Sequence, residues 1–123
     1  MKRILLIEDE EIMIDLLLRK LKSCGYEVIV ARDGQEGLDL LRVKKVAPDL
    51  ILMDIIMPKL NGFATMAEIQ KDEELKTIPI IVISNSGQPV ELDEAKRLGA
   101  RDWLLKTEFD PQELVGKIKA IIA

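Results

Sequence analysis

The sequence contains no histidine, a single cysteine, and aromatic residues at only 3% of its 123 positions. Without histidine, the chain cannot use imidazole for acid–base chemistry or for the metal sites in which it is the commonest ligand. The single cysteine, Cys24, cannot form a disulfide within the chain. Any chemistry must therefore rely on carboxylates, lysines and hydroxyl groups.

Long apolar runs are also missing. The first segment, MKRILLIEDEE, has four apolar residues before the acids begin, whereas a signal peptide needs about 7–15 and a membrane span about 20. The net charge of −4 argues against non-specific attraction to nucleic acid or anionic lipid. We therefore expect one cytoplasmic domain over residues 1–123, with no direct nucleic-acid or membrane partner.

Five short β-rich runs, at 3–7, 27–31, 50–54, 78–84 and 102–106, alternate with segments of helical periodicity. Most of these runs are continuously apolar, which is typical of strands covered on both faces of a parallel sheet. Gly25 and Gly99 stand where the first and fourth helices should end, as expected for glycine at helix C-caps. The alternation predicts an α/β fold, a doubly wound (βα)5 parallel sheet with helices on both faces.

Polar residues end four of the five predicted strands. Glu8 and Asp9 follow the first, Asp54 ends the third, Ser84 the fourth and Lys106 the fifth. In doubly wound sheets, ligand sites lie at the carboxyl ends of the strands, where the winding direction reverses. Two carboxylates about 5 Å apart repel by about 3 kcal/mol at an effective dielectric of ~20. A divalent cation with hard oxygen ligands, such as Mg²⁺, would relieve that repulsion.

Each of these residues also has a simpler interpretation. Glu8 and Asp9 could be a solvated helix start, Asp54 the N-cap of a following turn, Ser84 a turn residue and Lys106 a surface charge. Their joint occurrence at the ends of the right strands favours a functional site. There Asp54 is an oxygen nucleophile placed for a phosphoryl group, with metal and lysine compensating the charge.

Four segments resemble the receiver domain of two-component response regulators. They are ILLIEDEE (4–11), PDLILMDIIMPKLNG (48–62), IPIIVIS (78–84) and GARDWLLK (99–106). The resemblance extends over essentially the whole chain. It implies a flavodoxin-like three-layer sandwich with strand order 2-1-3-4-5.

The resemblance implies that Asp54 is the phosphoacceptor, receiving a phosphoryl group from a phosphohistidine of a sensor histidine kinase or a histidine phosphotransfer protein. It implies that Asp9 ligates Mg²⁺ directly, that Glu8 acts through a metal-bound water, and that Asp54 and the backbone carbonyl of Ile56 complete the protein ligands. Mn²⁺ is an alternative ion. The protein would then be a phosphoacceptor that assists its own phosphorylation and dephosphorylation, not an enzyme.

In the same resemblance, Ser84 and Lys106 bind the phosphoryl group, and Trp103 is an aromatic switch residue that responds to Ser84. The alternative role for Trp103 is to close the edge of the sheet. Ile56 and Ser86 match positions that tune dephosphorylation. The switch would shift the face formed by the fourth helix, fifth strand and fifth helix, which would bind an unidentified downstream protein or form a homodimer.

Three positions depart from the family pattern, one of which is Asn85, where a small residue is common. Ser84 stands where threonine is usual, although the hydroxyl is kept. Thr107 stands where the family commonly has proline after a cis peptide bond. A cis bond to a non-proline residue costs about 2.5–4 kcal/mol, so we expect either a strained Lys106–Thr107 bond or a lysine shifted away from Asp54.

Three other functions make different demands on the sequence. A receiver-fold interaction module without phosphorylation should have lost Asp54, the acid pair or Lys106, and the sequence has all of them. A Mg²⁺-dependent phosphatase of the haloacid dehalogenase type would need a second aspartate at position 56, where Ile56 stands. A flavodoxin-like cofactor binder would need a glycine-rich phosphate loop in place of EDEE.

Overall fold

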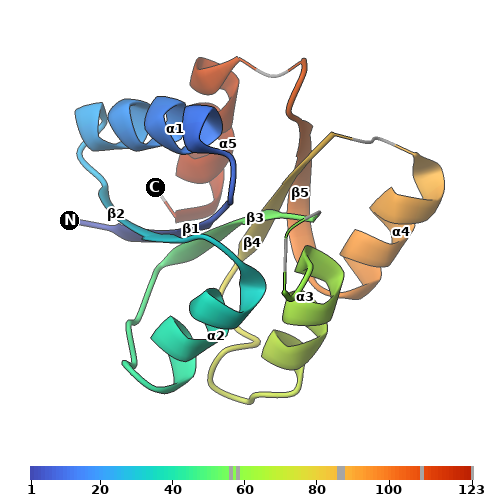
Figure 1. Cartoon of the computed structure of the whole chain (residues 1–123). Coiled ribbons are helices and arrows are strands. Elements are labelled where there is room, and N and C mark those ends of the chain that lie inside the picture. Colours follow the sequence, from blue (N-terminus) through green and yellow to red (C-terminus); the bar gives the residue numbers. More distant parts are fainter. Residues whose placement is uncertain (56, 58, 86–87, 109, 123) are drawn as a thin grey trace.

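The computed structural model describes residues 1–55, 57, 59–85, 88–108 and 110–122, in which five strands alternate with five helices (Figure 1). The strands are β1 (Arg3–Ile7), β2 (Glu27–Ala31), β3 (Leu50–Asp54), β4 (Ile80–Ser84) and β5 (Ala100–Leu105). The helices are α1 (Glu11–Ser23), α2 (Gly34–Arg42), α3 (Gly62–Gln70), α4 (Pro89–Arg97) and α5 (Pro111–Ile122).

The strands form one parallel sheet in the order β2-β1-β3-β4-β5, which confirms the predicted topology. From β1 the chain first adds β2 on one side and then crosses to β3, β4 and β5 on the other. The winding direction therefore reverses between β1 and β3, which is the position where such sheets place their ligand sites.

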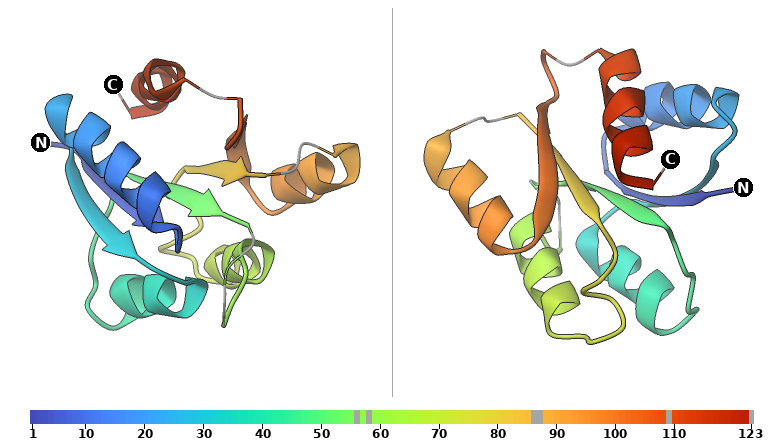
Figure 2. Two further views of the ribbon diagram at one scale, coloured as in Figure 1. Left: turned by 45° about the horizontal axis from the view of Figure 1, so that its top comes forward. Right: turned by 180° about the vertical axis from the view of Figure 1, so that it is seen from behind.

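Side chains that alternate along each strand pack into two separate cores, one on each face of the sheet. Figures 1 and 2 show α1 and α5 on one face and α2, α3 and α4 on the other. The core beneath α1 and α5 includes Ile4, Leu6, Leu50, Leu52, Ile81, Ile83, Leu17, Leu21, Leu114 and Ile118. The core on the opposite face includes Leu5, Ile7, Ile51, Met53, Ile80, Val82, Leu38, Met66, Ile69 and Ala95. This double burial explains why the central strands are apolar at every position.

The ends of the elements differ slightly from the predicted ranges. Strand β4 begins at Ile80, directly after Pro79, and β5 begins at Ala100 with a register shift that leaves Arg101 without a partner on β4. Gly25 and Gly99 follow the C-caps of α1 and α4 with φ angles of 90° and 100°, as the glycine pattern predicted. None of the helices in the described ranges is long and apolar enough to cross a bilayer.

Candidate functional site

Three acidic side chains meet at the carboxyl ends of β1 and β3. The two strands pair Ile7 with Met53, so the residues that follow, Glu8 and Asp54, lie at equivalent positions on neighbouring strands. Together with Asp9 they each place a carboxylate oxygen within 4.8 Å of the others. Glu8 and Asp54 are buried, with exposed fractions of 1% and 3%, whereas Asp9 is exposed.

The carboxylate of Glu8 also holds the start of α1. Its Oε2 accepts hydrogen bonds from the backbone N–H groups of Asp9 (3.1 Å) and Glu10 (3.0 Å). Glu10 itself occupies the N-cap position, and its side chain makes no capping hydrogen bond. One oxygen of Glu8 is therefore part of the helix start, but the residue is buried and not solvated as the simpler interpretation expected.

The backbone after β3 is held close to α3 by a glycine. The Gly62 N–H donates to the carbonyl of Ile55 at 2.7 Å, and a Cβ at position 62 would lie 2.4 Å from the Asp54 carbonyl oxygen. The N-cap of α3 is Asn61, whose Oδ1 accepts from the N–H of Ala64 at 2.9 Å. Asp54 is therefore not the cap of this helix, and its side chain is left for the site.

Lys106 supplies the positive charge at the centre of the cluster. Its Nζ lies 3.0 Å from Glu8, 2.9 Å from Glu10 and 3.1 Å from Asp54, and its side chain is only 5% exposed. Its backbone N–H donates to the carbonyl of Ser84 at 2.8 Å, which holds the residue beside the end of β4.

The expectation for the Lys106–Thr107 bond was wrong. The bond is trans, as no cis peptide bond occurs among the described residues, and Lys106 still reaches Asp54. Neither a strained bond nor a shifted lysine is needed. The hydrogen bond from the Lys106 backbone to Ser84 already fixes the start of the side chain, and four methylene groups carry the ammonium to the carboxylates.

Burial dominates the electrostatics of the two inner acids. The pKa of Glu8 is raised to about 7, chiefly by burial and also by the nearby charge of Asp54, against the lowering effect of hydrogen bonds from the Glu10 backbone and Lys106. Burial likewise raises the pKa of Asp54, despite the opposing charge of Lys106. Burial lowers the pKa of Lys106, but its hydrogen bonds to Glu10 and Glu8 and the charges of Glu8 and Asp54 together outweigh that effect and raise it. One lysine does not fully compensate this concentration of negative charge.

The residues present fit a divalent cation. The donors are hard carboxylate oxygens, which suit Mg²⁺ or Mn²⁺, and Glu8, Asp9 and Asp54 are close enough to share one ion. Although Lys106 Nζ lies 3.0 Å from Glu8 Oε1, this buried oxygen has no hydrogen-bond partner among the described residues. The predicted ligand at Ile56, through its backbone carbonyl, lies outside the described residues, as does Ser86.

Two further predicted site residues lie on neighbouring strands. Ser84 ends β4 and is buried, and it joins the cluster through the backbone contact with Lys106. Trp103 is half-buried on β5 opposite Val82. Its indole Nε1 is buried without a hydrogen-bond partner among the described residues. Its ring packs against the core beneath α2, α3 and α4, so the alternative role at the sheet edge also describes its present position.

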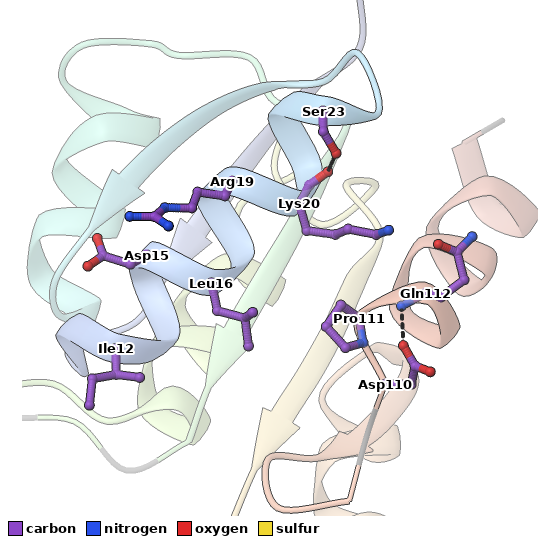
Figure 3. A pocket seen from close by; sticks show the side chains of 9 residues that line it. All are labelled: Ile12, Asp15, Leu16, Arg19, Lys20, Ser23, Asp110, Pro111 and Gln112. Atoms are coloured by element: carbon purple, nitrogen blue, oxygen red, sulfur yellow. Dashed lines mark hydrogen bonds between the residues drawn. The ribbon is translucent and has the colours of Figure 1, made fainter.

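Sequence reasoning missed Glu10, which lies next to the acid pair and contacts Lys106. It also missed a hollow between α1 and the start of α5, which is lined by Leu16 and Pro111 together with polar side chains such as Lys20 (Figure 3). The only available signal for this hollow is the pair Ile12 and Leu16, apolar residues that face solvent on an amphipathic helix. None of the predicted site residues lines it.

Comparisons with known proteins agree on the kind of domain. The family model described as the response regulator receiver domain matches residues 4–119. Protein PilH of Pseudomonas aeruginosa is 38% identical over 123 residues, which cover 100% of this chain and 99% of PilH. Transcriptional regulators among the other curated relatives are longer, and the chain spans 45–50% of their length.

Solved structures show the same similarity. The chemotaxis protein CheY4 of Vibrio cholerae superposes with a TM-score of 0.89 at 29% identity, over 98% of each chain. The phosphorylated cyanobacterial phytochrome response regulator RcpA superposes with a TM-score of 0.83 at 32% identity, over 98% of this chain and 90% of RcpA.

Proposed function

The chain belongs to the response regulator receiver domain family of two-component signalling proteins, and from this premise we propose that Asp54 is its phosphoacceptor. The observation that carries the proposal is the convergence of Glu8, Asp9, Asp54 and Lys106 at the switch point of the sheet. We further propose that residues 1–123 act as one receiver domain. Its donor would be the phosphohistidine of a sensor kinase or of a histidine phosphotransfer protein.

In the proposed transfer, a carboxylate oxygen of Asp54 attacks phosphorus, and the bond from phosphorus to the donor's imidazole nitrogen breaks. The imidazole leaves with the electron pair of that bond, and Asp54 becomes an acyl phosphate. The burial of Asp54, which raises its pKa, makes its carboxylate more basic than an exposed one. It is also poorly solvated, so less water must be displaced before attack.

Lys106 would stabilise the charge of the transferred phosphoryl oxygens, because its ammonium already lies 3.1 Å from Asp54 Oδ2. Glu8, Asp9, Asp54 and the carbonyl of Ile56 would hold Mg²⁺ or Mn²⁺. When bound, the ion supplies positive charge that neutralises phosphoryl oxygens. The Ser84 hydroxyl would donate a hydrogen bond to the phosphoryl group.

The proposed switch joins this site to the face formed by α4, β5 and α5. Strands β4 and β5 pair Val82 with Trp103 and Ser84 with Leu105. Since residues two apart share a face of a strand, Ser84 and Trp103 are expected to lie on the same face. A small hollow borders Trp103 on the α4 side, which gives the ring room to change its position. The altered face would bind a downstream protein or a second copy of the chain.

The lifetime of the phosphorylated state would depend on Ile56 and Ser86. An apolar side chain at position 56 can neither orient nor activate an attacking water. We therefore propose that the acyl phosphate is long-lived, with this domain assisting its own phosphorylation and dephosphorylation rather than acting on other substrates.

A protein donor is supported by the surface beside the site. Helix α1 begins directly after the acidic residues, and its Ile12 is 85% exposed. An exposed apolar side chain of this size next to a charged site is suited to contact with another protein. RcpA, at 32% identity, is a response regulator solved in a phosphorylated form, which supports the same chemistry here.

The test is to incubate the protein with acetyl phosphate and Mg²⁺ and to measure its intact mass. We expect one added phosphoryl group, lost when EDTA is present or when Asp54 is replaced by asparagine. A protein that keeps its fold but is not modified would be an interaction module. Continuous hydrolysis of many phosphate esters would instead indicate a phosphatase.

A further inference from the structure

Lys106 is bound by three carboxylates at once. A lysine ammonium has three N–H donors and no acceptor. In this structure its hydrogen bonds go to Glu8 Oε2 at 3.0 Å, Glu10 Oε1 at 2.9 Å and Asp54 Oδ2 at 3.1 Å. All three donors are therefore in use before any phosphoryl group arrives.

The three partners differ in how firmly they are held. Glu8 and Asp54 are buried, and their positions are set by strand ends. The side chain of Glu10 is 59% exposed and lies at the N-cap of α1, where it makes no capping hydrogen bond. Glu10 therefore contributes to the site through its contact with Lys106 rather than through a capping role in the helix.

A phosphoryl group on Asp54 would compete with these carboxylates for the N–H donors of Lys106. It brings several acceptor oxygens and negative charge to the place where Lys106 is already saturated. When fully ionised, the four acids of the cluster (Glu8, Asp9, Glu10 and Asp54) carry four negative charges, one more than a divalent cation and Lys106 together neutralise. Glu10 adds one of these charges without being needed to hold the cation, because the other three acids already share that role.

We propose that Glu10 restrains Lys106 and competes with the phosphoryl group for its ammonium, so that Glu10 weakens the binding of anionic phosphoryl groups at Asp54. This inference rests on the proposed function of the same site and adds a determinant of how readily it is occupied. Glu10 is a positioning residue, acting through Lys106. Its exposure allows it to release the lysine at small energetic cost.

The test uses beryllofluoride, an anion that adds to a carboxylate oxygen and imitates a phosphoryl group, at saturating Mg²⁺. Its affinity is measured by calorimetry for the wild type, Glu10→Gln and Glu11→Gln. Glu11 is a matched control because it is the next acid along the chain and pairs with the exposed Arg32. Exposed ion pairs contribute about 0.2–1 kcal/mol, so we expect Glu10→Gln to bind beryllofluoride about 1.4- to fivefold more tightly. Glu11→Gln should bind like the wild type.

A second readout separates competition from damage to the site. The Mg²⁺ affinity of Glu10→Gln should be unchanged or lower, because a negative charge has been removed, while beryllofluoride affinity rises. A disturbed structure would weaken both. Unchanged or weaker beryllofluoride binding by Glu10→Gln overturns the inference. If the wild type itself fails to bind beryllofluoride, or Asp54→Asn binds it equally well, the proposed function fails instead.

Discussion

Replacing Asp54 by asparagine should stabilise the Mg²⁺-free protein while it abolishes phosphorylation. The carboxylate is buried beside Glu8, and that burial raises its pKa, so the folded protein disfavours its charge. Asparagine has nearly the same shape, carries no charge and can donate a hydrogen bond to Glu8. A residue kept for function at the expense of stability is the expected pattern at a site of this kind.

The size of this stabilisation follows from attractive and repulsive contributions that act on the Asp54 carboxylate. At an effective dielectric of about 20, attraction to Lys106 at 3.1 Å contributes about 5 kcal/mol. Repulsion from Glu8, within 4.8 Å, offsets about 3 kcal/mol of this, and the exposed Asp9 offsets about 1. The remaining attraction is smaller than the desolvation penalty of several kcal/mol for a buried ion. Burying the asparagine amide still costs about 1–3 kcal/mol. We therefore expect Asp54→Asn to raise the free energy of unfolding by about 1–2 kcal/mol.

Urea and thermal denaturation in EDTA measure this gain, which corresponds to about 3–8 °C in the melting temperature. Asp93→Asn, on the exposed side of α4, removes the same charge and should change stability little. Added Mg²⁺ should stabilise the wild type by mass action and Asp54→Asn much less, so the difference narrows or reverses. An Asp54→Asn protein that is less stable than the wild type in EDTA would refute the reasoning about undercompensated charge.

Three other changes have defined outcomes. Without Mg²⁺, the raised pKa of Glu8, about 7 instead of 4.5, means that its protonation favours the folded state. This stabilisation is complete below pH about 4.5 and is lost as pH rises through about 7. The free energy of unfolding from urea denaturation should therefore fall between pH ~5 and ~8 by about 1–3 kcal/mol, and a rise over that range would contradict the burial argument. Gly62→Ala should lower the free energy of unfolding by about 2–4 kcal/mol and slow the phosphorylation of Asp54, because the alanine Cβ would lie 2.4 Å from the Asp54 carbonyl oxygen. Gly116 lies on α5, where an added Cβ would meet no atom within 4 Å. Gly116→Ala should instead raise the free energy of unfolding by about 0.5–1 kcal/mol. If both alanine substitutions change stability equally in denaturation curves, the close approach of α3 to the Asp54 backbone is not what requires glycine at position 62. Ile56→Asn should shorten the lifetime of the acyl phosphate, followed by intact mass, and an unchanged lifetime would count against the proposed role of an apolar residue there.

The fold could be predicted almost completely because its local signals agree. Continuous apolar runs at 50–53 and 80–83 are required by a sheet with a core on each face, and Gly25 and Gly99 have the positive φ angles that the pattern implied. The starts of β4 and β5 could not be predicted, since the register shift near Ile80 depends on pairing between strands. The strand order came from the family resemblance, since alternation alone allows several orders.

The site was only partly predictable for a physical reason. The rule that ligands bind at strand ends brought Glu8, Asp9 and Asp54 together correctly. The contact of Glu10 with Lys106 was missed because it depends on how the chain enters α1. The expectation for Lys106–Thr107 failed because it treated one peptide bond as what determines the position of the Lys106 ammonium. The backbone hydrogen bond to Ser84 already directs that side chain.

The most direct measurement is to locate the modification by mass spectrometry of peptides after treatment with acetyl phosphate and Mg²⁺. A phosphoryl group found only on the peptide that carries Asp54, and absent when Lys106 is replaced by methionine or the metal is removed, is the expected result. A phosphoryl group on another residue, or equal labelling of Asp54 without metal, would contradict the assignment of this cluster as a cation-dependent phosphoacceptor site.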